Sequence, residues 1–304
     1  MSKKKAIVIV SSVVAVVALG VGGFFAYRHF NKPVVEEKFD YQFTKENYPK
    51  LDCATAMYPL ATEITKALLN VDDTEAKNIA RCSKTNKAYK NLIEGEVDII
   101  FLSAPSQEVL DLAEEKGVEF EYTPIGRDAF VFINNKNNKV DTLSQAQLRE
   151  IYSGKITNWS QVGGSNSEIS AYQRPITSGS QTLMRKFMGD VSLKEPIENE
   201  IQPEMGDLIT AVANYDNSAS SLGYSVFYYA NEMIANPDVK FIKVDGVEPT
   251  KESITSNEYP ITKDVLAVIR KDEPQDSPAR KMIEYLLTAD GQDTVEKGGY
   301  VKIK

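Results

Sequence analysis

Two kinds of segment alternate along most of the chain. Continuous apolar runs, such as residues 97–102, which only Asp98 interrupts, are typical of strands buried on both faces. Between these runs lie amphipathic stretches in which apolar residues such as Leu60, Ile64 and Leu68 recur at helical spacing. Repeated strand–helix units of this length predict an α/β fold whose strands are mainly parallel and whose crossovers are right-handed.

Capping and breaking residues set the expected boundaries of these elements. Pro59 suits a helix start, Gly95 and Gly117 suit helix ends, and Ser144 with Gln147 forms a capping box. The first expected strand ends near residue 51, and the others cover residues 78–80, 97–102, 118–123, 169–172, 221–230 and 264–271. The first expected helix starts at residue 59, and the others cover residues 88–93, 109–116, 144–151, 182–188 and 279–287.

The body of the chain divides into two expected lobes. The pattern changes character beyond Phe130, and a second crossover is expected near Leu222. We therefore predict that residues 49–130 and 222–304 form lobe one and that residues 131–221 form lobe two. The lobes are expected to close about hinges at these two crossovers.

An apolar run without charge covers residues 6–27 and is long enough to span a bilayer. Lys3, Lys4 and Lys5 precede it, which favours a cytoplasmic N-terminus and an exported body. Residues 1–28 are therefore predicted to be a cytoplasmic tip with a transmembrane helix, or a cleaved signal segment, and residues 29–48 a linker. We expect a single-pass anchor in the cell membrane with the body extracellular.

Charge and histidine content exclude several functions. The five basic residues before Pro33 have no acidic counterpart, so the rest of the chain carries 30 basic and 43 acidic residues, a net charge of −13. This balance argues against a nucleic-acid-binding surface. The single histidine is His29, at the edge of the apolar run, so Ser-His-Asp catalysis and histidine metal sites are excluded. No cofactor or metal is predicted, and no enzyme activity.

Loops that follow the predicted strands are rich in small hydroxyl side chains. In an open parallel sheet such loops meet at the carboxyl edge, where helix N-termini also point. Arg174 adds a planar fork suited to two oxygens of a phosphate or carboxylate, and Gly179 lets the backbone approach a ligand. Any single hydroxyl in such loops can also serve only as a turn or cap residue. The candidate anion ligands are Thr55, Ser83, Thr85, Ser103, Arg174, Ser178, Gly179 and Ser180.

Four stretches of the chain resemble the phosphate-binding proteins of bacterial ABC transporters, in the form common in Gram-positive bacteria. They are residues 151–164, 173–182, 222–230 and 269–301. The resemblance runs from about residue 51 to the C-terminus and implies the two-lobed type II periplasmic-binding-protein fold. It implies phosphate or a similar oxyanion as ligand, permease subunits as partners, and ligand contacts from the eight residues named above.

Three positions depart from the family pattern. Cys53 and Ala54 replace Gly-Ser before Thr55, and Ala104 replaces the acidic residue that follows Ser103. That carboxylate accepts a hydrogen bond from protonated phosphate and repels sulfate, so its loss predicts weaker discrimination between the two anions. Ile176 stands where relatives carry Asp beside the arginine, which predicts a less restrained Arg174.

Cys53 and Cys82 are the only two cysteines, and each is expected just past a strand in neighbouring loops. Ends of adjacent strands can bring side chains within disulfide reach, and an exported protein permits a bridge. Two states of this pair are left open: a Cys53–Cys82 disulfide near the ligand, or two buried free thiols.

The leading hypothesis is an extracytoplasmic solute-binding protein that captures phosphate or a similar oxyanion for an ABC transporter. A non-transporting surface sensor or scaffold with a degraded site is the alternative, because Cys53, Ala54 and Ala104 alter one side of the site. A phosphatase lacks histidine, a metal cluster or an activated nucleophile, and is the weakest of the three hypotheses.

Overall fold

The computed structural model describes residues 39–196, 200–213 and 220–303. It divides into two units, Met1–Asp40 and Tyr41–Lys304, and the features below belong to the second. The predicted transmembrane segment, residues 6–27, lies outside the described residues. Within the described ranges, no helix combines the length and the apolar character needed to cross a membrane.

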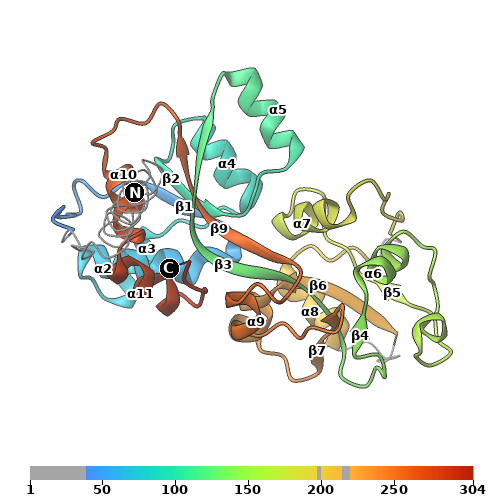
Figure 1. The fold of residues 1–304 in the computed structure, drawn as a ribbon. Helices are drawn as coiled ribbons and strands as arrows, with labels where there is room; N and C mark the ends of the chain where they lie inside the picture. The colour runs from blue at the N-terminus through green and yellow to red at the C-terminus, as the bar shows by residue number, and fades with distance from the viewer. Residues whose placement is uncertain (1–38, 197–199, 214–219, 304) are drawn as a thin grey trace, which may run out of the picture. The chain divides into compact units, whose positions relative to one another are not determined.

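Seven strands form the main sheet, in the order β1, β2, β9, β3, β6 and β5, with β7 also paired to β3 (Figure 1). Two further strands, β4 and β8, pair with each other. The strands are β1 Leu51–Cys53, β2 Ile99–Leu102, β3 Phe120–Asn135, β4 Thr142–Leu143, β5 Ser170–Ala171, β6 Ser221–Val226, β7 Val239–Phe241, β8 Lys243–Val244 and β9 Thr262–Arg270.

The prediction of mainly parallel sheets is wrong, because the sheet is mixed. β1 pairs with β2 in parallel, as β5 does with β6. In contrast, β9 is antiparallel to both β2 and β3, and β6 and β7 are antiparallel to β3. The cause lies in the path of the chain: β3 leaves the part of the sheet that contains β1 and β2, and β9 returns to it.

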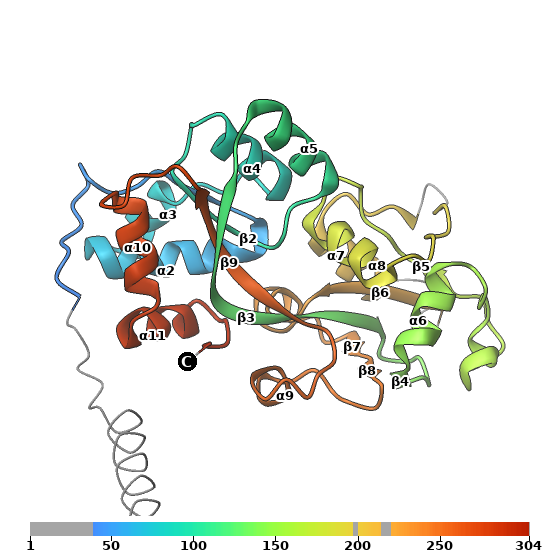
Figure 2. The same cartoon turned by 45° about the horizontal axis from the view of Figure 1, so that its top comes forward.

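β3 is shared between the two parts of the sheet. Its residues from Phe120 to Ala129 pair with β9, whereas those from Phe130 to Asn134 pair with β6. Both views show β3 and β9 lying side by side as they lead from the group with α4 and α5 to the group with α6 and β6 (Figures 1 and 2). Two neighbouring segments therefore join the two groups.

Helices cover the sheet, and several begin at the residues that the sequence indicates. Pro59 lies in the first turn of α2, and Ser144 and Gln147 form the predicted capping box. The α-helices are α2 Tyr58–Leu69, α3 Asp73–Ile79, α4 Thr85–Ile93, α5 Gln107–Lys116, α6 Gln145–Tyr152, α7 Gly179–Met188, α8 Met205–Ala213, α9 Lys251–Thr255, α10 Pro278–Leu286 and α11 Ala289–Lys297. A π-helix, Tyr229–Ile234, and short 3-10 turns at Thr55–Met57 and Trp159–Val162 complete the elements.

The strand expected at residues 78–80 is wrong, because this segment ends helix α3. Asp72 caps the helix, its side chain accepting a hydrogen bond from the Glu75 backbone N–H. Asp73 and Glu75 in the first turn complement the helix dipole. Only Ala76 of this short helix is buried, so the sequence carries almost no helical periodicity there.

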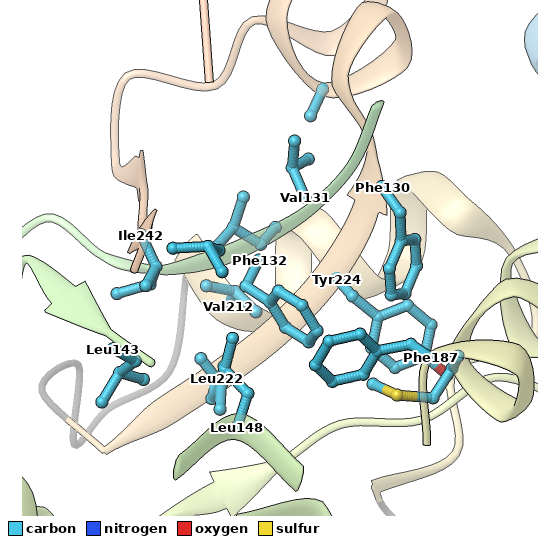
Figure 3. Close-up of a cluster of buried hydrophobic side chains, with 14 of the residues drawn as sticks. Phe130, Val131, Phe132, Leu143, Leu148, Phe187, Val212, Leu222, Tyr224 and Ile242 are labelled. Carbon is cyan, nitrogen blue, oxygen red and sulfur yellow. The ribbon is translucent and has the colours of Figure 1, made fainter. Parts of the chain in front are cut away.

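A large aromatic core lies beneath one side of the candidate site. Phe130 and Phe132 of β3 pack with Phe187 of α7 and Tyr224 of β6, with ring centroids 5.1–6.3 Å apart (Figure 3). The same cluster extends through Leu222 to residues between β6 and β9, including Ile242, Val244, Ile254 and Tyr259. Sequence reasoning places residues 222–259 in lobe one, whereas this core groups them with residues expected in lobe two.

Candidate functional site

A cavity of about 130 Å³ lies where the loops after β1 and β2 meet the start of α4 and the loop before α7. Seven of the eight predicted ligand-binding residues line it, although they come from four separate stretches of sequence. These seven residues are Thr55, Thr85, Ser103, Arg174, Ser178, Gly179 and Ser180.

Ser83 is the exception, because its polar groups are paired with β1 and with its own loop. Its backbone N–H donates to Asp52 Oδ1 at 2.7 Å, and its hydroxyl accepts from Arg81 Nε at 3.0 Å. Ser83 does not line the cavity, whereas Thr85 does. Of the two hydroxyls considered for this loop, the structure brings Thr85 to the site.

The first side of the cavity is formed by residues that directly follow or begin regular elements. Thr55 starts a 3-10 turn after β1, Thr85 is the first residue of α4, and Ser103 follows β2. The Ala54 backbone N–H donates to the Phe101 carbonyl at 3.0 Å, which ties the first loop to β2. The N-terminus of α4 brings the positive end of a helix dipole to this side.

Arg174 dominates the opposite side. It is only 8% exposed, yet its Nε and Nη1 atoms have no hydrogen-bond partner among the described residues. Its backbone N–H donates to the Tyr224 hydroxyl at 2.9 Å and to Gln181 Oε1 at 3.1 Å. Burial lowers the pKa of Arg174, and Glu204 partly opposes that effect. A buried guanidinium with unused donors is suited to an anionic ligand.

Helix α7 begins beside Arg174 with a regular N-cap. Ser178 Oγ accepts from the Gln181 backbone N–H at 3.1 Å, and Ser180 Oγ lies 3.5 Å from Ser178 Oγ. Since α7 starts at Gly179, its first unpaired N–H groups lie at the cavity. Backbone donors, two hydroxyls and the guanidinium thus converge on one space.

Three charged residues of the cavity were missed by sequence reasoning. Lys84 Nζ and Glu204 Oε1, both at the cavity, form an ion pair of 2.5 Å, and Lys263 reaches the cavity from the start of β9. Lys84 lies in the loop that sequence reasoning examined for hydroxyls, and its charge was a usable signal. Lys263 gave no signal of this kind, because a β9 parallel to β2 would begin at the edge of the sheet opposite to the hydroxyl loops.

None of the positions that depart from the family pattern brings a charged side chain to the cavity. Ala104 does not line the cavity, and Glu204 is the only acidic residue among the described residues that do. Ile176 is 65% exposed, and it is not among the residues that line the cavity. The cavity therefore presents mainly hydrogen-bond donors.

In the structure both cysteines are free thiols: Cys53, the last residue of β1, is buried, and Cys82, in the loop before α4, is exposed. Cys53 Sγ lies 3.3 Å from the Arg81 carbonyl oxygen. A hydrogen bond from Cys53, with smaller ones from the Lys84 backbone and the Thr55 side chain, lowers the pKa of Cys82 to about 7. The pKa of Cys53 is raised by its hydrogen bond to Cys82 and by burial. The structure has no Cys53–Cys82 disulfide, and the formation of one stays a prediction.

In the described ranges, no group of three or more His, Cys, Asp or Glu residues could hold a metal ion.

The cavity is lined mainly by hydrogen-bond donors and lies between two parts of a mixed α/β sheet, which is the arrangement of a solute-binding protein. A family model for the PBP superfamily domain matches residues 48–290. The chain belongs to the PBP superfamily.

Curated relatives and solved structures agree with this membership. The chain is 24% identical over 257 residues to the phosphate-binding protein PstS of Staphylococcus aureus, covering 83% of this chain and 77% of that one. It is 27% identical over 186 residues to the PstS protein of Borreliella burgdorferi, covering 60% of this chain and 66% of the relative.

Two crystal structures share the fold. One is a substrate-binding protein from Clostridium perfringens, assigned to a phosphate ABC transporter and solved with bound phosphate. Its superposition on this chain has a TM-score of 0.63 at 24% sequence identity, and it covers 87% of this chain and 100% of that one. The other is an ABC-type phosphate transport receptor from Vibrio cholerae, with a TM-score of 0.62 at 18% identity, covering 86% of this chain and 99% of that one. These likenesses show the α/β periplasmic-binding-protein fold.

Proposed function

We propose that this chain captures inorganic phosphate, or a similar small oxyanion, in the cavity lined by Arg174. The observation that carries the proposal is the buried guanidinium, whose Nε and Nη1 atoms have no partner in the described part of the chain. Leaving such donors unpaired costs free energy unless a ligand supplies the acceptors. The phosphate-binding relatives named above support phosphate as the ligand.

The proposed mechanism is closure of the two parts of the sheet around the anion. Two segments would act as hinges. One is β3 between Ala129 and Phe130, where its partner strand changes from β9 to β6, and the other is the segment that leads into β9. No covalent step is involved, so the protein acts as a receptor and not as an enzyme. A micromolar dissociation constant requires about 8 kcal/mol, which a few charge-assisted hydrogen bonds in a closed cavity can supply.

The proposed setting is the outer face of a cell membrane, with delivery of the anion to ABC permease subunits. The uncharged apolar run at residues 6–27 and the preceding lysines support an anchor with an exported body. The relatives that are named as parts of phosphate ABC transporters support the permease as partner.

Calorimetric titration of the full chain in a mild detergent with inorganic phosphate tests the ligand. We expect saturable binding in the micromolar range, and a loss of at least about 100-fold when Arg174 is replaced by Met, because a charged pair and its hydrogen bonds disappear. Absence of heat at millimolar phosphate would refute the proposal and favour a sensor or scaffold with a degraded site.

A further inference from the structure

Lys263 brings a second positive charge to the cavity. It is the second residue of β9 and lies among the cavity-lining residues together with Arg174. Its side chain is only 9% exposed, so this charge is held in a largely water-free position. A buried lysine requires compensating interactions, because loss of hydration strongly disfavours the ammonium form.

One of these interactions is with a predicted ligand residue. Lys263 Nζ donates a hydrogen bond to Ser103 Oγ at 3.2 Å. An ammonium group has no acceptor, so Ser103 must accept in this pair, and its own proton is then left for another partner. Because Ser103 lines the cavity, Lys263 prepares it as a donor toward a bound anion.

The second interaction is with Asp128 of β3, whose Oδ2 lies 3.6 Å from Lys263 Nζ. Asp128 Oδ1 accepts backbone hydrogen bonds from Ala129 at 2.8 Å and Tyr228 at 3.2 Å, so the carboxylate is fixed. Asp128 does not line the cavity, whereas Lys263 does. The carboxylate therefore supports the charged ammonium from behind, while the ammonium remains available to the cavity.

The other charges at the cavity leave room for an anionic ligand. Lys84 and Glu204 neutralise each other as an ion pair. Arg174 has no hydrogen-bond partner at Nε or Nη1 in the described part of the chain, and the carboxylate that pairs with Lys263, Asp128, lies outside the cavity lining. A tetrahedral oxyanion can therefore contact two cationic side chains, and it needs no proton to satisfy an acidic residue at position 104.

We propose that Lys263 is an anion-binding residue of this site, which contacts the ligand directly and holds Ser103 as a hydrogen-bond donor. The proposal rests on the proposed function, since it requires that the cavity binds an oxyanion. It adds a cationic contact from β9 to the cavity that Arg174 also lines.

The test is calorimetric titration of the full chain with inorganic phosphate and with sulfate, which carries no proton. Lys263→Met removes the charge but leaves Asp128 buried without a partner, so the double variant Lys263→Met/Asp128→Asn is measured beside it. Lys240→Met is the matched control, because Lys240 is also partly buried and pairs with Asp141, away from the cavity. Thermal melts show that each variant is folded.

Both Lys263 variants are expected to bind each anion about 10- to 100-fold more weakly than the unchanged chain, the usual effect of a lost hydrogen bond to a charged group. Lys240→Met is expected to bind normally. Unchanged affinity in Lys263→Met, or affinity recovered in the double variant, would overturn the proposal and leave Lys263 as a counter-ion of Asp128. If the unchanged chain binds neither anion, the proposed function fails as well.

Discussion

Thr85 and Gly179 meet across the cavity so closely that a Cβ atom on Gly179 would lie 2.5 Å from Thr85 Oγ1. The two residues begin helices α4 and α7, which belong to different parts of the sheet. Gly179 is therefore required by space, since its backbone does not have a positive φ angle. The contact brings two helix N-termini to one cavity.

Replacing Gly179 with Ala is expected to weaken phosphate binding by roughly 5- to 150-fold, because overpacking at a tight contact costs about 1–3 kcal/mol. Titration with phosphate measures the loss. Gly206→Ala is the matched control, since Gly206 also lies in the first turn of a helix and an added Cβ would meet Tyr229 Oη at 3.3 Å and Ile234 Cδ1 at 3.8 Å, both side-chain atoms and both farther than the contact at Gly179. Equal affinities for the two variants would contradict the proposed contact between the loops in the ligand-bound state.

The Lys84–Glu204 ion pair is expected to assist binding in two ways. It joins the two sides of the cavity, and it neutralises the only acidic side chain found among the described lining residues. Lys84→Ala is expected to weaken phosphate binding several-fold at low salt and less at high salt, because exposed ion pairs are worth at most about 1 kcal/mol and are screened.

The double variant Lys84→Ala/Glu204→Gln separates these two effects, since it also removes the unpaired acidic charge. Its affinity is expected to lie between those of Lys84→Ala and the unchanged chain. Lys77→Ala is the control, because Lys77 pairs with Asp73 on α3, away from the cavity. A salt-independent loss in Lys84→Ala would argue against an electrostatic role.

Sequence reasoning found most helices because their caps are local signals. Ser144 and Gln147 sit three residues apart and form the capping box that their identities predict. The direction of β9 is not a local property, because it depends on where the chain goes after β3. A run such as residues 265–269 is apolar whether its neighbours run parallel or antiparallel to it.

The same limit explains which residues of the site were missed. Thr55 and Ser103 could be found because they follow β1 and β2, and Arg174 because its chemistry is distinctive. Thr85 was found although the strand expected before it is the end of helix α3. Lys263 comes to Ser103 only because β9 runs antiparallel to β2, with Leu266 opposite Leu102. A sheet assumed to be parallel hides this proximity, and so the mistaken topology and the missed cation have one cause.

Arg174→Met is expected to stabilise the ligand-free protein even though it abolishes binding. The guanidinium is buried with unpaired donors, and leaving such a group unsatisfied costs about 1–3 kcal/mol. Thermal melts without phosphate are expected to show a rise of about 2 °C or more. Arg149→Met is the control and is expected to lower the melting temperature, because Arg149 donates to the Phe187 carbonyl and stacks on its ring. A lower melting temperature for Arg174→Met would contradict the interpretation.

Cys82 is expected to react with iodoacetamide at unusually low pH. Only the thiolate reacts, and the pKa of Cys82 is lowered to about 7, chiefly by the hydrogen bond from Cys53. The alkylation rate, followed by mass spectrometry of peptides containing Cys82, is therefore expected to rise through pH 7 and to level off above about pH 8. In Cys53→Ser a hydroxyl replaces the thiol that donates to Cys82, so the pH dependence of Cys82 alkylation is expected to change. In Cys82→Ser the alkylated peptide is expected to be absent. A midpoint near pH 9 in the unchanged chain would contradict the lowered pKa of Cys82. Two cysteines that resist alkylation until they are reduced would contradict the free thiols.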